Sequence, residues 1–355
     1  MTAPTTAPTT APTTAPTTAP TTVRTVDTDV HCAPPALDTL LPYLDPYWRR
    51  YVADAGISLS PHQGGAYPIG IRPGGTPAHV PAELLIDTDA ALLSCTTSFH
   101  CNRNPYYEAA LCRAVNDWLL EQWHGHDQRM RVSVVVPTLD TEAAVAELAR
   151  LEGRPGVAAV LLPVRMDARW GNVRYRPLLR AAAERDLVVT LHAWGRAGNA
   201  PMPSGMTHSY LEDYLANSQT LAQAQLTSLV AEGVFAALPT LRVTVAECGS
   251  TWLPTLLWRF DKDWKGTWRE VPWVNRPPSE LVREHVRFTT APIHLPSDPE
   301  QARAAIDLLG PELLMQASDR PHDHGPGAER LRAVLTAAEL EAVQGGTAAE
   351  WFRLG

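Results

Sequence analysis

Short segments of apolar and β-branched residues alternate along this chain with longer segments whose apolar residues recur at helical spacing. The short segments are apolar or β-branched at consecutive positions, which is typical of strands covered on both faces in a parallel sheet. Eight strand–helix units follow one another, and no Gly-x-Gly-x-x-Gly comes after the first strand. We therefore predict a (β/α)8 TIM barrel rather than a doubly wound sheet. The predicted strands cover residues 26–31, 90–94, 131–136, 157–162, 187–192, 241–247, 285–289 and 313–317.

Two segments depart from this alternation. Residues 2–22 repeat Thr-Ala-Pro-Thr with no charge and no aromatic residue, so residues 1–22 are predicted to be a disordered tail. Residues 23–355 are then the barrel domain. Residues 32–88 are rich in Pro and Gly and too long for a plain loop, so we expect an insertion over the barrel mouth, the end at which the strands finish.

Composition excludes several classes of partner and location. The formal net charge of −8 argues against nucleic acid and anionic membrane surfaces. No stretch is long and apolar enough to span a bilayer, and the N-terminus lacks the pattern of a signal peptide. The five cysteines are scattered with no CxxC pair, which favours free thiols in the cytoplasm.

Ligand-type residues stand at the ends of four predicted strands. Asp29 and His31 end the first strand, and because they are two residues apart their side chains should point to one face. His192 and Glu247 end the fifth and sixth strands, and Asp319 follows the eighth. Active residues of TIM barrels lie at these strand ends. A carboxylate and an imidazole together suit zinc, manganese or iron. Taken alone, however, Asp29 and His31 fit a hydrogen-bonded pair or two solvated residues better than a metal site.

The motifs around these residues resemble those of a known superfamily. Asp29-x-His31, the LHAWG segment at 191–195 and the ASDRPH segment at 317–322 are similar to amidohydrolase motifs. The nearest branch contains aminocarboxymuconate semialdehyde decarboxylase and related aromatic-acid decarboxylases. The resemblance implies one divalent metal ion, with zinc as the first expectation and manganese or iron as alternatives. The implied metal ligands are Asp29, His31, His192 and Asp319.

Glu247 departs from that pattern, because many members of the branch end this strand with a histidine. Glu247 is predicted to have an active-site role as a base, as a metal ligand or in orienting Trp252 and a neighbouring histidine. The alternative is a buried structural carboxylate. His322 is expected to orient the metal site or a substrate carboxylate, or to lie behind the ligands.

Several further polar residues near the predicted mouth have two interpretations. Arg165 and Arg320 suit an anionic substrate or an ordinary ion pair, and His100 and Asn102 follow the second strand. His324 is predicted to be a solvated loop residue. Cys32, next to His31, is predicted to be a buried thiol rather than a nucleophile.

The resemblance implies a metal-dependent enzyme acting on a small carboxylated aromatic or enolic substrate, with Asp319 giving a proton to the ring carbon. The alternative reaction is hydrolysis of an amide, lactone or cyclic imide, in which Asp319 takes a proton from water. A catalytically inactive barrel that serves as a binding partner is a third hypothesis. The tryptophans between 252 and 273 suggest helix packing or a homodimer or higher homo-oligomer.

Overall fold

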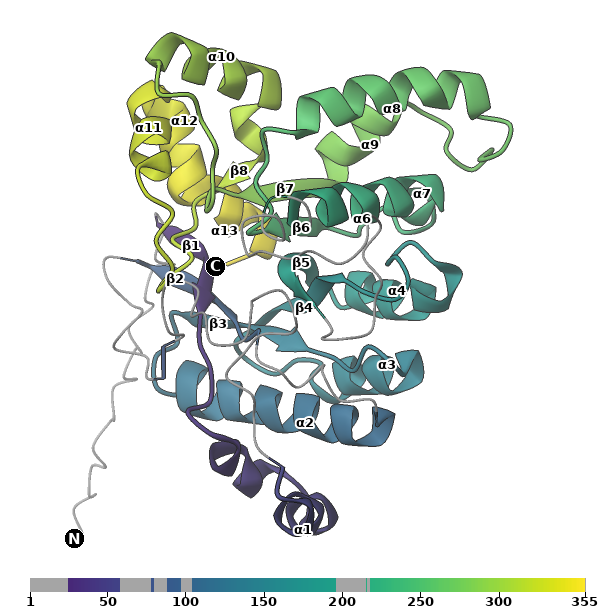
Figure 1. The fold of residues 1–355 in the computed structure, drawn as a ribbon, viewed down its shortest axis with the longest axis vertical. Coiled ribbons are helices and arrows are strands. Elements are labelled where there is room, and N and C mark those ends of the chain that lie inside the picture. Colours follow the sequence, from purple (N-terminus) through teal and green to yellow (C-terminus); the bar gives the residue numbers. More distant parts are fainter. Residues whose placement is uncertain are drawn as a thin grey trace, which may run out of the picture.

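The computed structural model describes residues 25–57, 78–79, 88–96, 104–195, 215 and 218–354, so the predicted tail lies outside the described residues. Eight parallel strands form one sheet in chain order, each bonded to the next (Figure 1). They are β1 (Val26–His31), β2 (Ala90–Ser94), β3 (Met130–Val135), β4 (Val157–Arg165), β5 (Val188–Gly195), β6 (Val243–Ala246), β7 (Val286–Thr289) and β8 (Leu314–Met315).

The chain just past β8 bonds to β1 and closes the ring. The Thr28 N–H donates to Gln316 O at 2.9 Å, and the His31 N–H donates to Arg320 O at 2.7 Å. Between them, the Asp319 N–H donates to Asp29 O at 2.9 Å. The predicted (β/α)8 TIM barrel is therefore confirmed, and Asp29 is joined to Asp319 through the backbone.

Helices follow the strands and cover the outside of the barrel (Figure 1). Two helices between Gln219 and Ala237 are separated at Gly233, whose φ of 67° is left-handed and ends helical geometry. The helices after β2 are α2 (Pro105–Trp118), α3 (Thr141–Arg150), α4 (Arg176–Glu184), α6 (Gln219–Ala231), α7 (Val234–Ala237), α8 (Leu253–Thr267), α9 (Pro278–His285), α10 (Pro299–Leu309), α11 (Gly327–Val334), α12 (Ala337–Glu341) and α13 (Thr347–Phe352).

Part of the predicted insertion is described. It contains the 3₁₀ helix η1 (Leu37–Tyr43) and α1 (Pro46–Ala55), which begins at an Asp45 cap. The ring of Trp48 lies 5.2 Å from that of Tyr107, so this part packs against α2. In the portion of the chain that the structure describes, no helix is long and apolar enough to cross a membrane.

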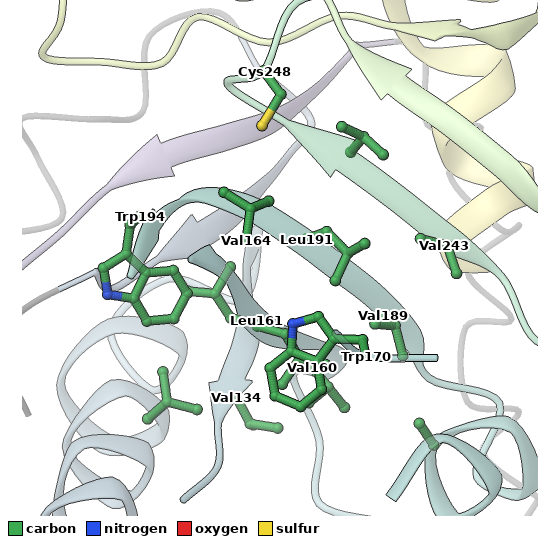
Figure 2. Close-up of a cluster of buried hydrophobic side chains, with 14 of the residues drawn as sticks. Val134, Val160, Leu161, Val164, Trp170, Val189, Leu191, Trp194, Val243 and Cys248 are labelled. Atoms are coloured by element: carbon green, nitrogen blue, oxygen red, sulfur yellow. The ribbon is translucent and has the colours of Figure 1, made fainter. Parts of the chain in front are cut away.

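The C-terminal helix α13 packs against the end of the barrel opposite the mouth. Trp351 and Phe352 form one apolar cluster with Val26 and Met315 from the strands. A separate and larger cluster lies between strands and helices and includes Val189 and Leu191 of β5 (Figure 2). Side chains alternate along a strand, so His192 faces the barrel interior, away from Leu191.

Candidate active site

A register irregularity in β1 sets the direction of the first two predicted ligands. Val26 packs at the barrel interior whereas Val30 packs in the outer cluster, although strict alternation would put both on one face. The pairing of β1 with β2 shifts between Asp27 and Val30, which accounts for the change of face. Asp29 and His31, on either side of Val30, consequently point into the barrel and are fully buried.

Asp29 is held at both carboxylate oxygens. The Ser94 hydroxyl at the end of β2 donates to Asp29 Oδ1 at 2.6 Å. His192 Nε2 lies 3.1 Å from Asp29 Oδ2. These contacts bring residues 65 and 163 positions away in the chain to one carboxylate, as the barrel topology requires.

Asp319 enters the same cluster from the turn after β8. Its φ of 54° is left-handed, a strained value for a residue with a side chain. Asp319 Oδ1 lies 2.7 Å from His31 Nε2 and 3.2 Å from His322 Nδ1, and Oδ2 contacts His324 Nε2. Asp29, His31, His192 and Asp319, here called the four-residue cluster, therefore lie together in the structure.

The chemistry of the four-residue cluster fits a divalent cation. His31 Nε2 is buried, and it lies 2.7 Å from Asp319 Oδ1. Ligand atoms of Asp29, His31 and His192 lie within 4.8 Å of one another, and so do those of His31, Asp319 and His322. Two carboxylates and two imidazoles are a donor set that zinc, manganese and iron accept.

The charges of the four-residue cluster also favour a bound cation. Burial opposes ionisation of Asp29, but His192 and His31 lower its pKa below the ordinary value. Burial also opposes ionisation of Asp319, yet His31, His322 and His324 bring its pKa well below the ordinary value. Within the described residues, both carboxylates are ion-paired with histidines alone. Buried negative charge of this kind is what a bound cation neutralises.

His322 and His324 both contact the Asp319 carboxylate. His322 is half-buried, and its ring lies 4.7 Å from that of His31, which places it beside the cluster. The prediction that His324 is a solvated loop residue was wrong, because its Nε2 contacts Asp319 Oδ2. The left-handed turn at Asp319 brings residue 324 back toward residue 319, and sequence spacing alone did not indicate this.

Glu247 lies immediately after β6 and beside His192, with its Oε2 3.7 Å from His192 Nδ1. Burial raises the pKa of Glu247 well above its ordinary value, and the nearby Asp319 adds to this. This position is compatible with the predicted active-site role of Glu247.

Asp27 is a buried carboxylate that sequence analysis did not assign. Its Oδ1 accepts from Ser318 N–H at 2.8 Å and from Asp29 N–H at 3.4 Å. Asp27 thus ties the β1 irregularity to the turn that carries Asp319. Burial raises the pKa of Asp27 to about 6, although the bonds from Ser318 act in the opposite direction.

Exchanging Asp27 for Asn should remove a pH dependence of stability. The folded protein retains the Asp27 proton up to about pH 6, whereas the unfolded chain releases it near pH 4. The free energy of unfolding of the wild type should therefore fall, relative to Asp27→Asn, by up to about 3 kcal/mol as pH rises through this window. Denaturant unfolding of both proteins in chelator at the two ends of the window measures this. Parallel pH curves would contradict it.

The remaining predicted residues have mixed outcomes. Cys32 is buried and free, as expected. Arg165 is the last residue of β4, and the backbone of Arg320 bridges to Val30. His100 and Asn102 lie outside the described residues.

Comparison with known proteins identifies the family. The sequence model of the amidohydrolase family matches residues 100–354. The chain belongs to the amidohydrolase family. The matched span carries His192, Glu247 and Asp319, while Asp29 and His31 precede it, so the first pair depends on the geometry above. The resemblance seen in the sequence is confirmed for the family.

Solved structures share the amidohydrolase barrel, whereas no curated protein sequence is a significant match. A 5-carboxyvanillate decarboxylase from Sphingomonas paucimobilis is 21% identical with a TM-score of 0.67, covering 94% of this chain and 100% of its own. The corresponding enzyme from Novosphingobium aromaticivorans, solved with manganese and 4-hydroxy-3-methoxy-5-nitrobenzoic acid, is 17% identical with a TM-score of 0.68, covering 94% and 97%. A 2,6-dihydroxybenzoate decarboxylase from Rhizobium is 18% identical with a TM-score of 0.64, covering 93% and 98%.

Proposed function

We propose that this amidohydrolase-family protein is a metal-dependent, non-oxidative decarboxylase of a small carboxylated aromatic or enolic compound. The observation that carries the proposal is the position of Asp319, which contacts both His31 of the four-residue cluster and His322 outside it. The decarboxylases named among the structural neighbours support the reaction class, and the manganese bound in one of them supports the cofactor.

The proposed ligands are the four residues of the cluster. One divalent cation, zinc, manganese or iron, would hold the substrate carboxylate and a neighbouring phenol or enol oxygen. Asp29 is held at both oxygens, by the Ser94 hydroxyl and by His192. The full burial of Asp29, His31 and His192 keeps bulk water away from the donor atoms.

Asp319 is proposed to deliver the proton that replaces the carboxyl group. Its histidine contacts favour the carboxylate form, so Asp319 must first gain a proton. His322, whose Nδ1 lies 3.2 Å from Asp319 Oδ1, is placed to supply it. Asp319 then protonates the ring carbon, the bond to the carboxyl group breaks, and its electron pair returns to the ring as carbon dioxide leaves.

Hydrolysis of an amide, lactone or cyclic imide is the second candidate, and one observation favours it. An Asp319 that rests as a carboxylate is ready to act as a base toward water without prior protonation. Both reactions use the same residues, so product analysis has to separate them.

The decarboxylase proposal predicts a specific isotopic product. A panel of ortho-hydroxybenzoates, enolic carboxylates, amides and lactones is incubated in D₂O with the manganese- or zinc-loaded protein. We expect carbon dioxide release from a carboxylate, with one deuterium on the carbon that lost the carboxyl group, because Asp319 and His322 exchange their protons with solvent. Turnover confined to amides or lactones would contradict the proposal and support the hydrolase.

We also propose that the protein forms a homodimer or higher oligomer and works in the cytoplasm. Trp258, Trp268 and Trp273 are each about half exposed or more, and Trp252 packs inside. Cys32, Cys112 and Cys248 are buried free thiols, in keeping with a reducing compartment. Light scattering of the purified protein measures the oligomeric state, and a monomer would contradict the first part.

A further inference from the structure

An oxygen atom lies close to the second ring nitrogen of each histidine in the four-residue cluster. His31 Nδ1 lies 3.4 Å from Thr96 Oγ1, just past β2. His192 Nδ1 is buried with no hydrogen-bond partner among the described residues. The nearest ion-pairing oxygen is Glu247 Oε2 at 3.7 Å, just outside hydrogen-bonding range. A small movement of the Glu247 side chain would therefore satisfy the unpaired nitrogen.

The turn after β6 is built to present Glu247 to His192. The Glu247 φ of 56° is left-handed, which is an unfavourable backbone conformation for a residue with a side chain. The Glu247 N–H donates to Thr289 Oγ1 at 3.3 Å. Trp252 Nε1 donates to Cys248 O at 3.0 Å and to Gly249 O at 3.1 Å, which fixes the following residues.

The strand register adds to this placement. His192 of β5 pairs with Ala246 of β6, and Glu247 is the next residue after Ala246. Glu247 is therefore close to His192. The other ring nitrogen of His192, Nε2, faces Asp29 at 3.1 Å. The imidazole thus lies between the Asp29 carboxylate on the cluster side and the Glu247 carboxylate at Nδ1.

We propose that Glu247 is a positioning residue that accepts the Nδ1–H of His192 and so leaves Nε2 unprotonated toward the cluster. A histidine binds a cation through its neutral nitrogen, and the hydrogen bond at the other nitrogen selects the tautomer and fixes the ring. Of the roles that the sequence left open for Glu247, this is the orientation of a histidine. The inference rests on the proposed function only in that the cluster binds a divalent cation.

Metal affinity of Glu247 variants tests this assignment. Dissociation constants for Mn²⁺ are measured from the free-ion paramagnetic resonance signal for wild type, Glu247→Ala and Glu247→Gln. Glu247→Ala should weaken Mn²⁺ binding roughly 10- to 100-fold. Glu247→Gln should stay within about fivefold of wild type, since its amide oxygen accepts the same bond. Glu300→Gln, an exposed carboxylate on α10, is the matched control and should bind like wild type.

The Co²⁺-loaded proteins give a second readout. The visible bands should move in Glu247→Ala, because the imidazole is no longer fixed, and should match wild type in Glu247→Gln. Wild-type affinity and spectrum in Glu247→Ala would overturn the inference. Equal weakening in Glu247→Ala and Glu247→Gln would also overturn it, because the charge of Glu247 would then matter rather than its acceptor oxygen.

The outcomes separate this inference from the proposed function. Weakened Mn²⁺ binding in Glu247→Ala, with no carbon dioxide from any substrate of the panel, would support the role of Glu247 and contradict the decarboxylase. Carbon dioxide release with unchanged Mn²⁺ affinity in Glu247→Ala would do the reverse. A wild-type protein that binds no Mn²⁺, Zn²⁺ or Fe²⁺ would overturn both.

Discussion

Asp319→Asn should abolish turnover and leave the barrel folded. The amide keeps the size of the side chain but removes both the negative charge next to His31 and the proton that the reaction needs. Proton transfer by a positioned side chain is worth about 10²- to 10⁴-fold, and the variant also loses a proposed metal ligand. We therefore expect a fall of at least about 10³-fold in kcat, measured as carbon dioxide release or as hydrolysis, whichever reaction the wild type shows.

A nearby carboxylate provides the control. Asp323 is exposed and lies in the same loop, where its Oδ1 accepts from the Gly325 N–H. Asp323→Asn should retain wild-type turnover. Circular dichroism and thermal unfolding establish that Asp319→Asn is folded. A folded Asp319→Asn with wild-type turnover would contradict the assigned role in both candidate reactions.

Removal of the metal should have the second large effect. Dialysis against a chelator is expected to abolish turnover, and added Mn²⁺ or Zn²⁺ should restore it. The chelated protein should also melt at a lower temperature, because two fully buried carboxylates then lie close together without a cation. A cation present at 100 times its dissociation constant stabilises the fold by about 3 kcal/mol.

Turnover and thermal unfolding of the same chelated sample show whether the protein depends on a metal ion bound at the four-residue cluster. If chelation lowers both turnover and thermal stability, and added metal alone restores them, the four-residue cluster is supported as the binding site. Full turnover after chelation, with no metal detected in the sample, would contradict metal dependence. An inactive barrel that serves only as a binding partner would show no turnover with any metal.

The location of the site residues at strand ends could be predicted because the active residues of a parallel barrel lie at the carboxyl ends of its strands. β1 and β2 begin and end where the sequence indicates, and His192, Glu247 and Asp319 fall at or near the predicted ends. The apolar, β-branched character of each strand is a local property, so it can be read without knowledge of the partners.

Contacts that depend on register and backbone strain could not be predicted in this way. Ser94 reaches Asp29 only because β1 and β2 pair with a shift, and no local pattern encodes that shift. His324 returns to Asp319 through a left-handed turn that a non-glycine residue rarely adopts. Asp27 carries no local signal of its role, because its partner, Ser318, lies 291 residues away.

The short helices α9 and α13 are hard to predict from the sequence for related reasons. α9 begins at Pro278, directly after Pro277, and it spans only 8 residues. α13 is 6 residues long and too short for a periodic signal. Its place is fixed by packing against Val26 and Met315 at the closed end of the barrel, which is a tertiary effect.

A crystal structure of the Mn²⁺-loaded protein, with anomalous diffraction recorded, tests the central claim most directly. We predict one anomalous peak at the barrel mouth, within coordination distance of Asp29, His31 Nε2, His192 Nε2 and Asp319. An active, Mn²⁺-loaded protein whose anomalous peak lies away from these four residues would contradict the account.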